Sequence, residues 1–468
     1  MIIYGSPSIM SALHPQMLPT KLHLKPTIFH RFQMRPDTPG PRALLHALRA
    51  IRFALFFKLK NMRSILHCDI NNCFASIESA INPNLKGLPI AVCGNPKERR
   101  GIVLAKSEEA KKHGVKTGDP IWQARQKCPQ LLCIPPHYDA YAQYSDAIQK
   151  YYLQFTPLVE PYGLDECWLD VSHHPNPLRL AGQIRTDIRR IFQITVSIGL
   201  SFNKVFAKLG SDLKKPDAIS HIPYNTFTHI TWGLPVSSLL GAGRATTETL
   251  ATFGIKTIGQ LAKSNRSFIK SKLGKHGDRL WQFANGMDES PVLPYGHQDT
   301  RQSISHGTTL PQDAHTPNEL WPTLQSLAQN IGFTLQQEHL NGQNIAITIR
   351  DAALQFKQYQ TEISIPTAAC TRIASYAYML LTQNYPWHTP IRAITIKVSH
   401  LTQETNPIQL PLFPGQSDTL PQDHLDQTLQ AIQTRYGPNI LCRGYQFKRP
   451  TPSRNTFPHP HPGSCKNA

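Results

Sequence analysis

Three carboxylates stand at or beside the ends of predicted strands in the first half of the chain. Asp69 follows the apolar run of ILHCDI, which predicts a buried strand. Asp165 and Glu166 are adjacent in GLDECWLDVS, where apolar and acidic residues alternate as on a strand with one wet face. A carboxylate at the end of an apolar strand costs free energy unless a cation or a hydrogen-bond donor meets it.

Two or three carboxylates brought together repel one another unless cations neutralise them, and hard oxygen ligands select Mg²⁺ or Mn²⁺. An Asp-Glu pair joins one cluster most easily at a strand end, because adjacent strand residues point to opposite faces. Two such ions ~3.5 to 4 Å apart stabilise the attacking and leaving oxygens of an in-line phosphoryl displacement. An isolated strand-end Asp, however, is often a turn or cap residue.

Basic residues follow the predicted strand ITVSIGLS and could neutralise a triphosphate: Lys204, Lys208, Lys214 and Lys215. The alternative for such lysines is a solvated helix end. The whole chain carries 49 Lys and Arg against 30 Asp and Glu, a net charge of +19. This excess suits a polyanion, either nucleic acid or an anionic membrane surface.

Composition predicts a folded, soluble, multidomain protein of 468 residues with 40% apolar residues. No run approaches the ~18 to 20 apolar residues of a membrane-spanning helix, so no membrane association is expected. The nine cysteines are scattered singly, which favours free thiols in a reducing cytoplasm.

Residues 1–61 differ from the rest, with nine Lys or Arg against a single acid, Asp37. This extension could be a basic arm for nucleic acid or a transit peptide. A third reading, which we favour, is that translation starts at Met62, directly before the first strand. We therefore expect residues 1–61 to be disordered or not translated.

The order of predicted elements after Met62 indicates an α+β core domain built around a sheet. A strand at 64–70 leads to a helix beginning near Cys73, two further strands, two short helices and a helix at 138–154. The strand GLDECWLDVS, the strand ITVSIGLS and an amphipathic helix in NKVFAKLGSDLKKPDA complete it.

Two smaller units follow the core. Two short helical patterns joined at FGI, with a GAG turn ahead of them, predict a helix-hairpin-helix, in which small residues let main-chain N–H groups approach phosphate. Its candidate DNA-binding residues are Gly241, Gly243 and Gly254. Residues 299–400 read β-α-β-β-α-β, with helices at 317–338 and 366–384. The tail from Thr402 is rich in Pro, Gln and His.

In this order, ILHCDINNCFASIE, GLDECWLDVS and SIGLSFNKVFAKLGSDLKKPDA resemble Y-family translesion DNA polymerases, nearest the DNA polymerase IV branch. The resemblance runs from about Met62 to Arg443. It implies a right-hand polymerase, an α+β fold with a C-terminal βαββαβ domain. Its parts would be the palm (62–72 and 137–230), fingers (73–136), thumb (231–297), little finger (298–402) and a tail (403–468) with a clamp-binding peptide.

The resemblance also assigns roles to residues. Asp69, Asp165 and Glu166 match the catalytic carboxylates that hold two Mg²⁺ ions, with Mn²⁺ possible, and the carbonyl of Ile70 would be an additional ligand. Phe74 matches the steric gate, whose ring leaves no room for a ribose 2′-OH; core packing is the alternative for this side chain. Lys215 matches the triphosphate-binding lysine.

The sequence departs from the family pattern at two places. Asn71 stands where many relatives have a second Asp, so one negative charge near the metals is removed. Glu108 and Lys111 stand where relatives often place Tyr and Arg over the triphosphate. A Glu beside phosphate would repel it, whereas Lys111 could still bind nucleotide as a point charge.

QLPLF in the tail resembles the short peptide by which bacterial polymerases dock on the sliding clamp, with a Gln that hydrogen-bonds and apolar side chains that fill a pocket. Its residues are Gln409, Leu410, Leu412 and Phe413. The alternative is a local hydrophobic staple onto the little finger.

Together these features predict a monomeric, template-directed, low-fidelity DNA polymerase without proofreading. Its partners would be primer-template DNA, dNTPs and the sliding clamp, in a bacterial cytoplasm. A two-metal nuclease could use the same carboxylates but needs neither a steric gate nor a clamp peptide. A non-catalytic DNA-binding scaffold would be expected to have lost the carboxylates.

Overall fold

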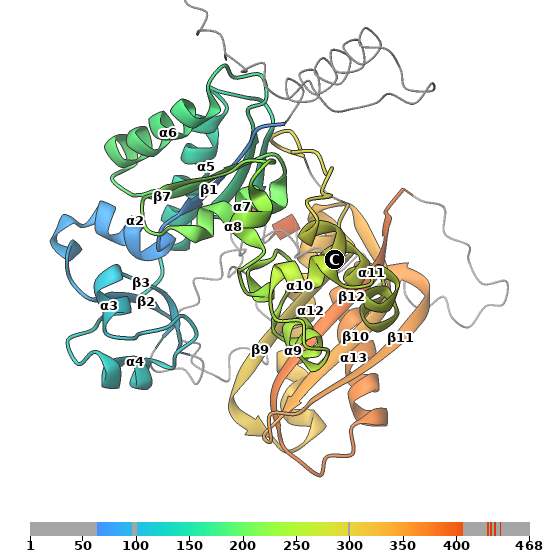
Figure 1. The fold of residues 1–468 in the computed structure, drawn as a ribbon. Coiled ribbons are helices and arrows are strands. Elements are labelled where there is room, and N and C mark those ends of the chain that lie inside the picture. Colours follow the sequence, from blue (N-terminus) through green and yellow to red (C-terminus); the bar gives the residue numbers. More distant parts are fainter. Residues whose placement is uncertain are drawn as a thin grey trace, which may run out of the picture. The chain divides into compact units, whose positions relative to one another are not determined.

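The computed structural model describes residues 63–95, 101–297 and 300–405, with short pieces at 428–429, 431–432, 435–436 and 440 (Figure 1). The basic extension at 1–61 and the clamp peptide at 409–413 lie outside the described residues. Among the helices of the described residues, none combines the length and the apolar character needed to cross a membrane.

The first sheet has five strands in the order β5-β6-β1-β7-β8. They are β1 (Ile65–Ile70), β5 (Val159–Tyr162), β6 (Glu166–Asp170), β7 (Val196–Ser201) and β8 (Ile219–Ile222). Only the β7–β8 pair is parallel; the other neighbours run antiparallel. The predicted first strand is therefore the central one, and every residue of β1 is buried.

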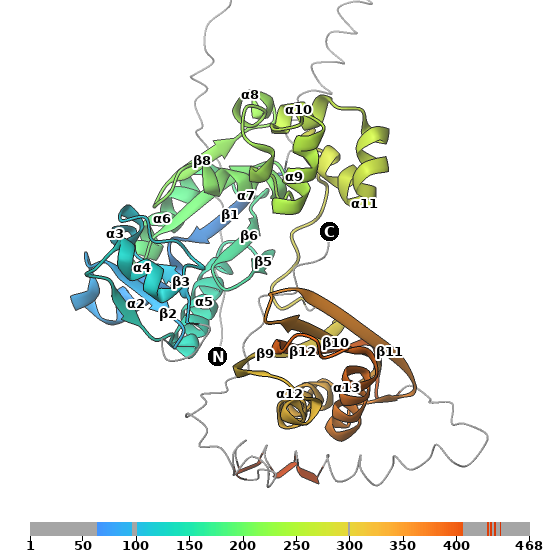
Figure 2. The ribbon, with the colours of Figure 1, turned by 90° about the horizontal axis from the view of Figure 1, so that it is seen from below.

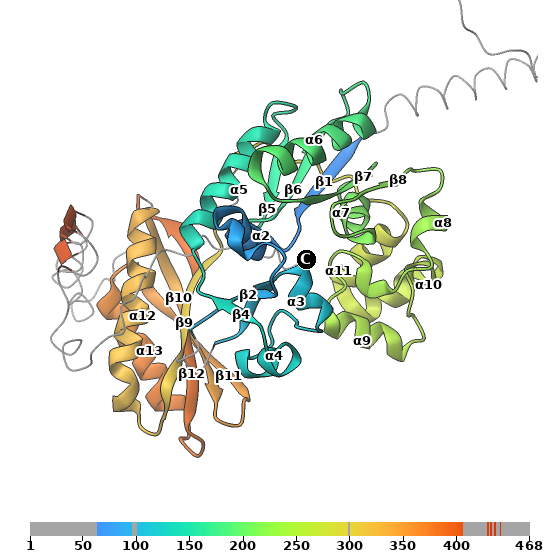
Figure 3. The same cartoon turned by 90° about the vertical axis from the view of Figure 1, so that its left-hand side faces the viewer.

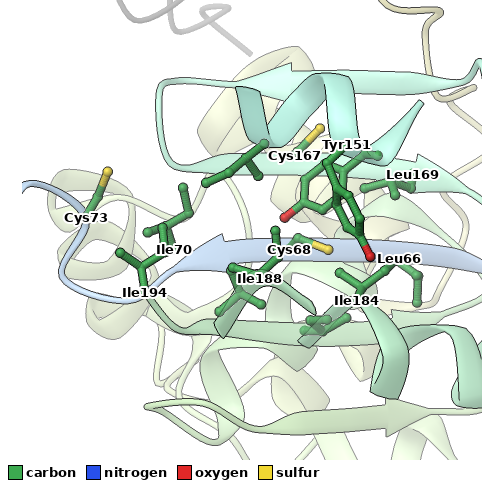
Figure 4. Packing of buried hydrophobic residues seen from close by; sticks show 14 of the residues in the cluster. Leu66, Cys68, Ile70, Cys73, Tyr151, Cys167, Leu169, Ile184, Ile188 and Ile194 are labelled. Carbon is green, nitrogen blue, oxygen red and sulfur yellow. The ribbon is translucent and has the colours of Figure 1, made fainter. Parts of the chain in front are cut away.

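Helices cover both faces of this sheet, with α5 (Tyr138–Tyr152) and α6 (Pro177–Phe192) on one side and α7 (Lys204–Leu213) on the other (Figure 3). Leu66, Cys68 and Ile70 of β1 pack with Ile184 and Ile188 of α6 (Figure 4). Because side chains alternate along a strand, the remaining β1 residues, His67 and Asp69 among them, belong to the face that α7 covers.

The close approach of α7 to the sheet depends on Gly199 in β7. A Cβ at this position would overlap the carbonyl oxygen of Ala207 and the main-chain nitrogen of Ser211. Gly199 is also the register partner of His67 on β1. A residue without a side chain here lets α7 lie directly on the sheet beside the polar residues of β1.

The second sheet has three strands in the order β3-β2-β4. Its elements lie between residues 73 and 134: α2 (Cys73–Ile81), β2 (Ile90–Cys93), β3 (Val103–Lys106), α3 (Glu108–Lys112), α4 (Ile121–Lys127) and β4 (Leu132–Ile134). The strand and two short helices expected after residue 101 are present. A small core of its own, including Ala91, Val103 and Ala110, supports this region.

A helical region follows, made of α8 (Phe227–Thr231), α9 (Arg244–Thr252), α10 (Ile258–Lys263) and α11 (Arg266–Ala284). The two short helices joined at FGI are α9 and α10. Gly254 between them has a φ of 75°, and a capping box from Thr257 and Gln260 starts α10. The sequence patterns predicted neither α11 nor α6.

The final sheet has the order β11-β10-β12-β9, and α12 and α13 lie on one face of it (Figure 2). Its elements are β9 (Ser303–Ala314), α12 (Pro317–Gln337), β10 (Leu340–Asp351), β11 (Phe356–Thr367), α13 (Cys370–Asn384) and β12 (Ile391–Gln403). The β-α-β-β-α-β order is thus confirmed. The expected helix start at 366 is wrong, because β11 continues to Thr367, whose hydroxyl accepts from Ala369 N at 3.0 Å.

Candidate active site

The two acidic motifs meet at one end of the first sheet. Asp69 of β1 lies directly opposite Glu166, the first residue of β6, in the antiparallel register. Asp165 lies in the turn just before β6, and its carbonyl accepts a hydrogen bond from Ile70 N at 2.9 Å. The structure therefore places all three carboxylates at the same end, because the Asp-Glu pair stands at a strand boundary.

Helix α7 and the residues that follow it bring cations to these carboxylates. Lys208 Nζ forms an ion pair with Glu166, and Lys215 Nζ lies 2.7 Å from Asp69 Oδ2 and 2.8 Å from Asp212 Oδ1. Lys204, in contrast, pairs with Glu160 at 2.6 Å. Of the lysines considered from the sequence, Lys208 contacts Glu166 and Lys215 contacts Asp69.

The pKa values of these three acids are shifted in different directions. Burial raises the pKa of Asp69 to about 7, because the attraction of Lys215 does not offset it and the neighbouring acids add repulsion. The pKa of Asp165 is raised by burial and then by the charge of Glu166. Burial also acts to raise the pKa of Glu166, but His67 and Lys208 outweigh it and hold that pKa well below its usual range.

The fit of these residues to a divalent metal follows from their chemistry. Within the described residues, no group of three or more His, Cys, Asp or Glu side chains is arranged as a metal site, and ammonium groups contact two of the carboxylates. Nevertheless the donors are hard oxygens, and burial together with repulsion between the acids raises the pKa values of Asp69 and Asp165. A hard divalent cation would offset that repulsion, so the residues fit Mg²⁺ or Mn²⁺.

Phe74 lies in the first turn of α2, five residues after Asp69. Its ring stacks on Tyr141 of α5, with ring centroids 4.3 Å apart and planes 11° apart. The Tyr141 hydroxyl in turn donates a hydrogen bond to the buried carboxylate of Glu78 on α2. Phe74 is thus held at the edge of the core in a fixed orientation, and the sequence patterns did not indicate Tyr141 as its support.

Asn71 stands where many relatives have a second Asp. In the structure its side chain is buried and holds neighbouring segments together. Its Oδ1 accepts from Asp217 N at 2.8 Å and from the Thr195 hydroxyl at 3.1 Å, while its Nδ2 donates to the Ser197 hydroxyl at 2.9 Å. The first of these bonds ties the loop that carries Lys215 to the end of β1. A carboxylate could accept these bonds but could not donate one.

Glu108 at the start of α3 does not stand free. Its Oε1 accepts from Asn72 Nδ2 at 2.8 Å and lies 3.3 Å from Lys111 Nζ. Glu108, the acid expected to repel phosphate, is therefore paired with Lys111, the cation expected to contact nucleotide. Asn72 follows the end of β1, so this contact links β1 to α3.

His67 is a site residue that sequence reasoning missed. It is fully buried on β1, with Nδ1 2.8 Å from the Ser211 hydroxyl and Nε2 3.3 Å from Glu166 Oε2. Its position two residues before Asp69 is the signal that could have found it, since alternate strand residues share a face.

The glycines of the helix-hairpin-helix occupy turns. Gly241 has a φ of 89°, in the left-handed region that favours glycine, and Gly243 is the N-cap residue of α9. Exposed cations lie in the turn before α10, at Lys256, and on the helices α10 and α11: Lys263, Arg266, Lys270, Lys272, Lys275 and Arg279. These charges would suit a phosphate backbone.

Comparison with known proteins agrees with this architecture. Residues 68–212 match the model of the impB/mucB/samB family, and residues 301–412 match that of the impB/mucB/samB family C-terminal domain. DNA polymerase IV of Acetivibrio thermocellus is 38% identical over 386 residues, covering 82% of this chain and 97% of that protein. DNA polymerase IV 1 of Bacillus subtilis is 33% identical over 392 residues, covering 83% and 94%.

A solved structure shares the fold. A Y-family DNA polymerase chimera of Dbh and Dpo4 superimposes with a TM-score of 0.65 at 23% identity, covering 73% of this chain and 99% of that one. The sheet with acids at one end, the helical region and the βαββαβ domain define a right-hand polymerase. The chain belongs to the impB/mucB/samB family, the Y-family of translesion DNA polymerases, and is a DNA-directed DNA polymerase.

Proposed function

We propose that this chain adds deoxynucleotides to a primer 3′ end by metal-assisted nucleotidyl transfer at Asp69, Asp165 and Glu166. These carboxylates would hold two Mg²⁺ ions, or Mn²⁺, together with the carbonyl of Ile70. When bound, the ions supply charge stabilisation for the attacking and leaving oxygens. The observation that carries the proposal is the register pairing of Asp69 with Glu166 beside two lysines of the α7 segment.

The protein's own groups have separate tasks in this proposal. Lys215, which contacts Asp69, would turn to the triphosphate once metal neutralises the carboxylates, because ammonium and phosphate attract strongly in a partly buried site. Phe74 would exclude a ribose 2′-OH through the position that Tyr141 gives its ring. Lys111 would contact nucleotide after leaving Glu108.

Primer-template DNA would be held through its phosphates. The main-chain N–H groups around Gly241, Gly243 and Gly254 and the exposed cations of the helical region suit such contacts. Residues 409–413 would dock on a sliding clamp. We further propose that the protein works as a monomer in a bacterial cytoplasm, and that the domains have the boundaries expected from the sequence.

Primer extension with single dNTPs and Mg²⁺ tests the proposal. Wild-type protein should incorporate the template-matched dNTP, while the Asp165→Ala/Glu166→Ala variant should bind primer-template and incorporate nothing. Asp139→Ala, at an exposed acid of α5, is the matched control and should remain active. Incorporation by the double variant would refute the assignment; a wild type that binds DNA without extending it would indicate a scaffold, and shortened primers a nuclease.

A further inference from the structure

Asp217 lies two residues after Lys215 and is held by two neighbouring parts of the first sheet and its helices. Its main-chain nitrogen donates to Asn71 Oδ1 at 2.8 Å, just beyond the end of β1. From α6, Arg185 Nη1 donates to the main-chain oxygen of Asp217 at 3.3 Å. The Asp217 carboxylate forms ion pairs with Arg189 and, at 3.7 Å, with Arg185 Nε. Both the backbone and the side chain of Asp217 are therefore fixed.

These contacts hold a backbone conformation that residues with a side chain rarely adopt. Asp217 has a φ of 54°, in the left-handed region, which Asp and Asn tolerate better than most residues but less well than glycine. Such a conformation persists where the surroundings determine it. The bonds from Asn71 and α6 supply that support at Asp217.

The Asp217 carboxylate depends mainly on Arg189. Its Oδ1 has no hydrogen-bond partner within the described residues, since Arg185 Nε is 3.7 Å away, whereas Oδ2 pairs with Arg189 Nη2. The Asp217 side chain is only 13% exposed, whereas that of Arg189 is 59% exposed. Substitution of Arg189 therefore removes the anchor of the carboxylate without opening the core.

The connection that carries Lys215 is short. Residues 214–218 join the end of α7 to the start of β8. Asp217 is tied to elements outside this connection, whereas Lys215 Nζ lies 2.7 Å from Asp69 Oδ2. Because only Pro216 separates the two residues, a shift of Asp217 would displace the main chain of Lys215 and the reach of its ammonium group.

We propose that Asp217, anchored by Arg189, is a positioning residue that sets the place of the Lys215 ammonium group and thereby the affinity for dNTP. This inference rests on the proposed contact of Lys215 with the triphosphate. The alternative is that Arg189 only neutralises the Asp217 carboxylate, which would otherwise repel the triphosphate. Removal of the Asp217 charge distinguishes the two, because it loosens Lys215 in the first case and removes a repulsion in the second.

Single-nucleotide incorporation kinetics separate these cases. Arg189→Gln removes the anchoring charge, Arg189→Lys keeps it, and Asp217→Asn removes its partner while retaining a residue type that tolerates the left-handed region. Arg190→Gln is the matched control, because Arg190 is also an exposed arginine of α6 but pairs with Asp187 of the same helix at 3.1 Å. Melting temperature and primer-template affinity are measured for every variant.

Arg189→Gln and Asp217→Asn should each raise KM for dNTP about two- to fivefold with kcat unchanged. The reason is that a triphosphate contact made equally in the ground and transition states changes binding only. Arg189→Lys should restore most of the wild-type KM, and Arg190→Gln should match wild type. In a Lys215→Gln background neither change should raise KM further, because both act through the lysine.

An unchanged KM in Asp217→Asn would overturn the positioning role even if Arg189→Gln raised KM. If Asp217→Asn does not fold, the combination of Arg189→Gln with Lys215→Gln decides: an unpaired carboxylate would still repel the triphosphate there, so a further rise of KM would overturn positioning. Failure of the proposed function has a different signature, since Lys215→Gln itself would then have the wild-type KM. A raised KM in Lys215→Gln with no effect of Arg189→Gln would reject only the positioning role.

Discussion

Asp69 and Glu166 face each other across two antiparallel strands, yet their pKa values are shifted in opposite directions. Burial dominates at Asp69, whereas at Glu166 the neighbouring His67 and Lys208 outweigh burial. Two carboxylates whose environments separate their proton affinities are a common property of active sites. Glu166 therefore stays charged at neutral pH, whereas Asp69 becomes charged only as pH rises through about 7.

The raised pKa of Asp69 makes the metal-free protein less stable as pH rises. Its pKa moves from an ordinary value of 3.8 to about 7 on folding, so the folded state binds the proton more tightly. The stabilisation is complete at low pH and is lost as pH rises through about 7. Asp69→Asn should therefore melt at a progressively higher temperature relative to wild type from about pH 5 to about pH 8 in a chelator.

Thermal unfolding monitored by circular dichroism measures this difference. Asp139→Asn, which changes an exposed acid of α5 in the same way, is the matched control. If wild type gained stability relative to Asp69→Asn over the same range, Lys215 rather than burial would control the carboxylate.

Phe74→Ala should weaken sugar discrimination. Removing the ring that stacks on Tyr141 opens space where a ribose 2′-OH would lie, so the ratio of kcat/KM for a dNTP to that for the matching ribonucleotide should fall at least about tenfold. Single-nucleotide incorporation kinetics measure the ratio. Phe253→Ala, at a half-exposed ring beside α9, is the control; an unchanged ratio in Phe74→Ala would place the gate elsewhere.

Glu108→Gln should strengthen nucleotide binding. The amide can still bond to Asn72, but it no longer attracts Lys111, which becomes free for phosphate. Because exposed ion pairs contribute only about 0.2 to 1 kcal/mol, we expect KM for dNTP to fall by up to about fivefold with kcat unchanged. The neighbouring Glu109→Gln serves as control, and the gain should vanish in Glu108→Gln/Lys111→Gln. A rise in KM would show that Glu108 assists binding.

DNA binding should depend steeply on salt and weakly on sequence, since phosphate contacts release counterions. Lys256→Gln, at an exposed lysine beside the hairpin glycine Gly254, should reduce the slope of log K against log salt by about one. Fluorescence anisotropy with labelled primer-template gives the slope, and Lys150→Gln on α5 is the control. A slope identical to wild type would remove Lys256 from the interface.

The sequence alone predicted the strands and helices with strong hydrophobic patterns. It also predicted that Asp69, Asp165 and Glu166 stand at or beside strand ends. A continuous apolar run predicted β1, the alternation of apolar and acidic residues predicted β6, and ITVSIGLS was predicted as the strand that is β7. The strand-boundary argument predicted that the Asp-Glu pair joins Asp69. Helices α6 and α11 were not predicted. In α11 the helix is interrupted at Gly274, which has a φ of 63°. In α6 the apolar residues Leu180, Ile184 and Ile188 recur at helical spacing, which is the signal that indicates this helix.

Only the tertiary structure decided which polar and charged side chains contact one another. His67 and Ser211 are 144 residues apart in the chain, and Lys215 and Asp69 are 146 apart. Their contacts depend on strand register and on how closely α7 packs against the sheet at Gly199. Local pattern carries no information on either, because a lysine on a helix face has the same sequence signature whether it meets water or a buried carboxylate.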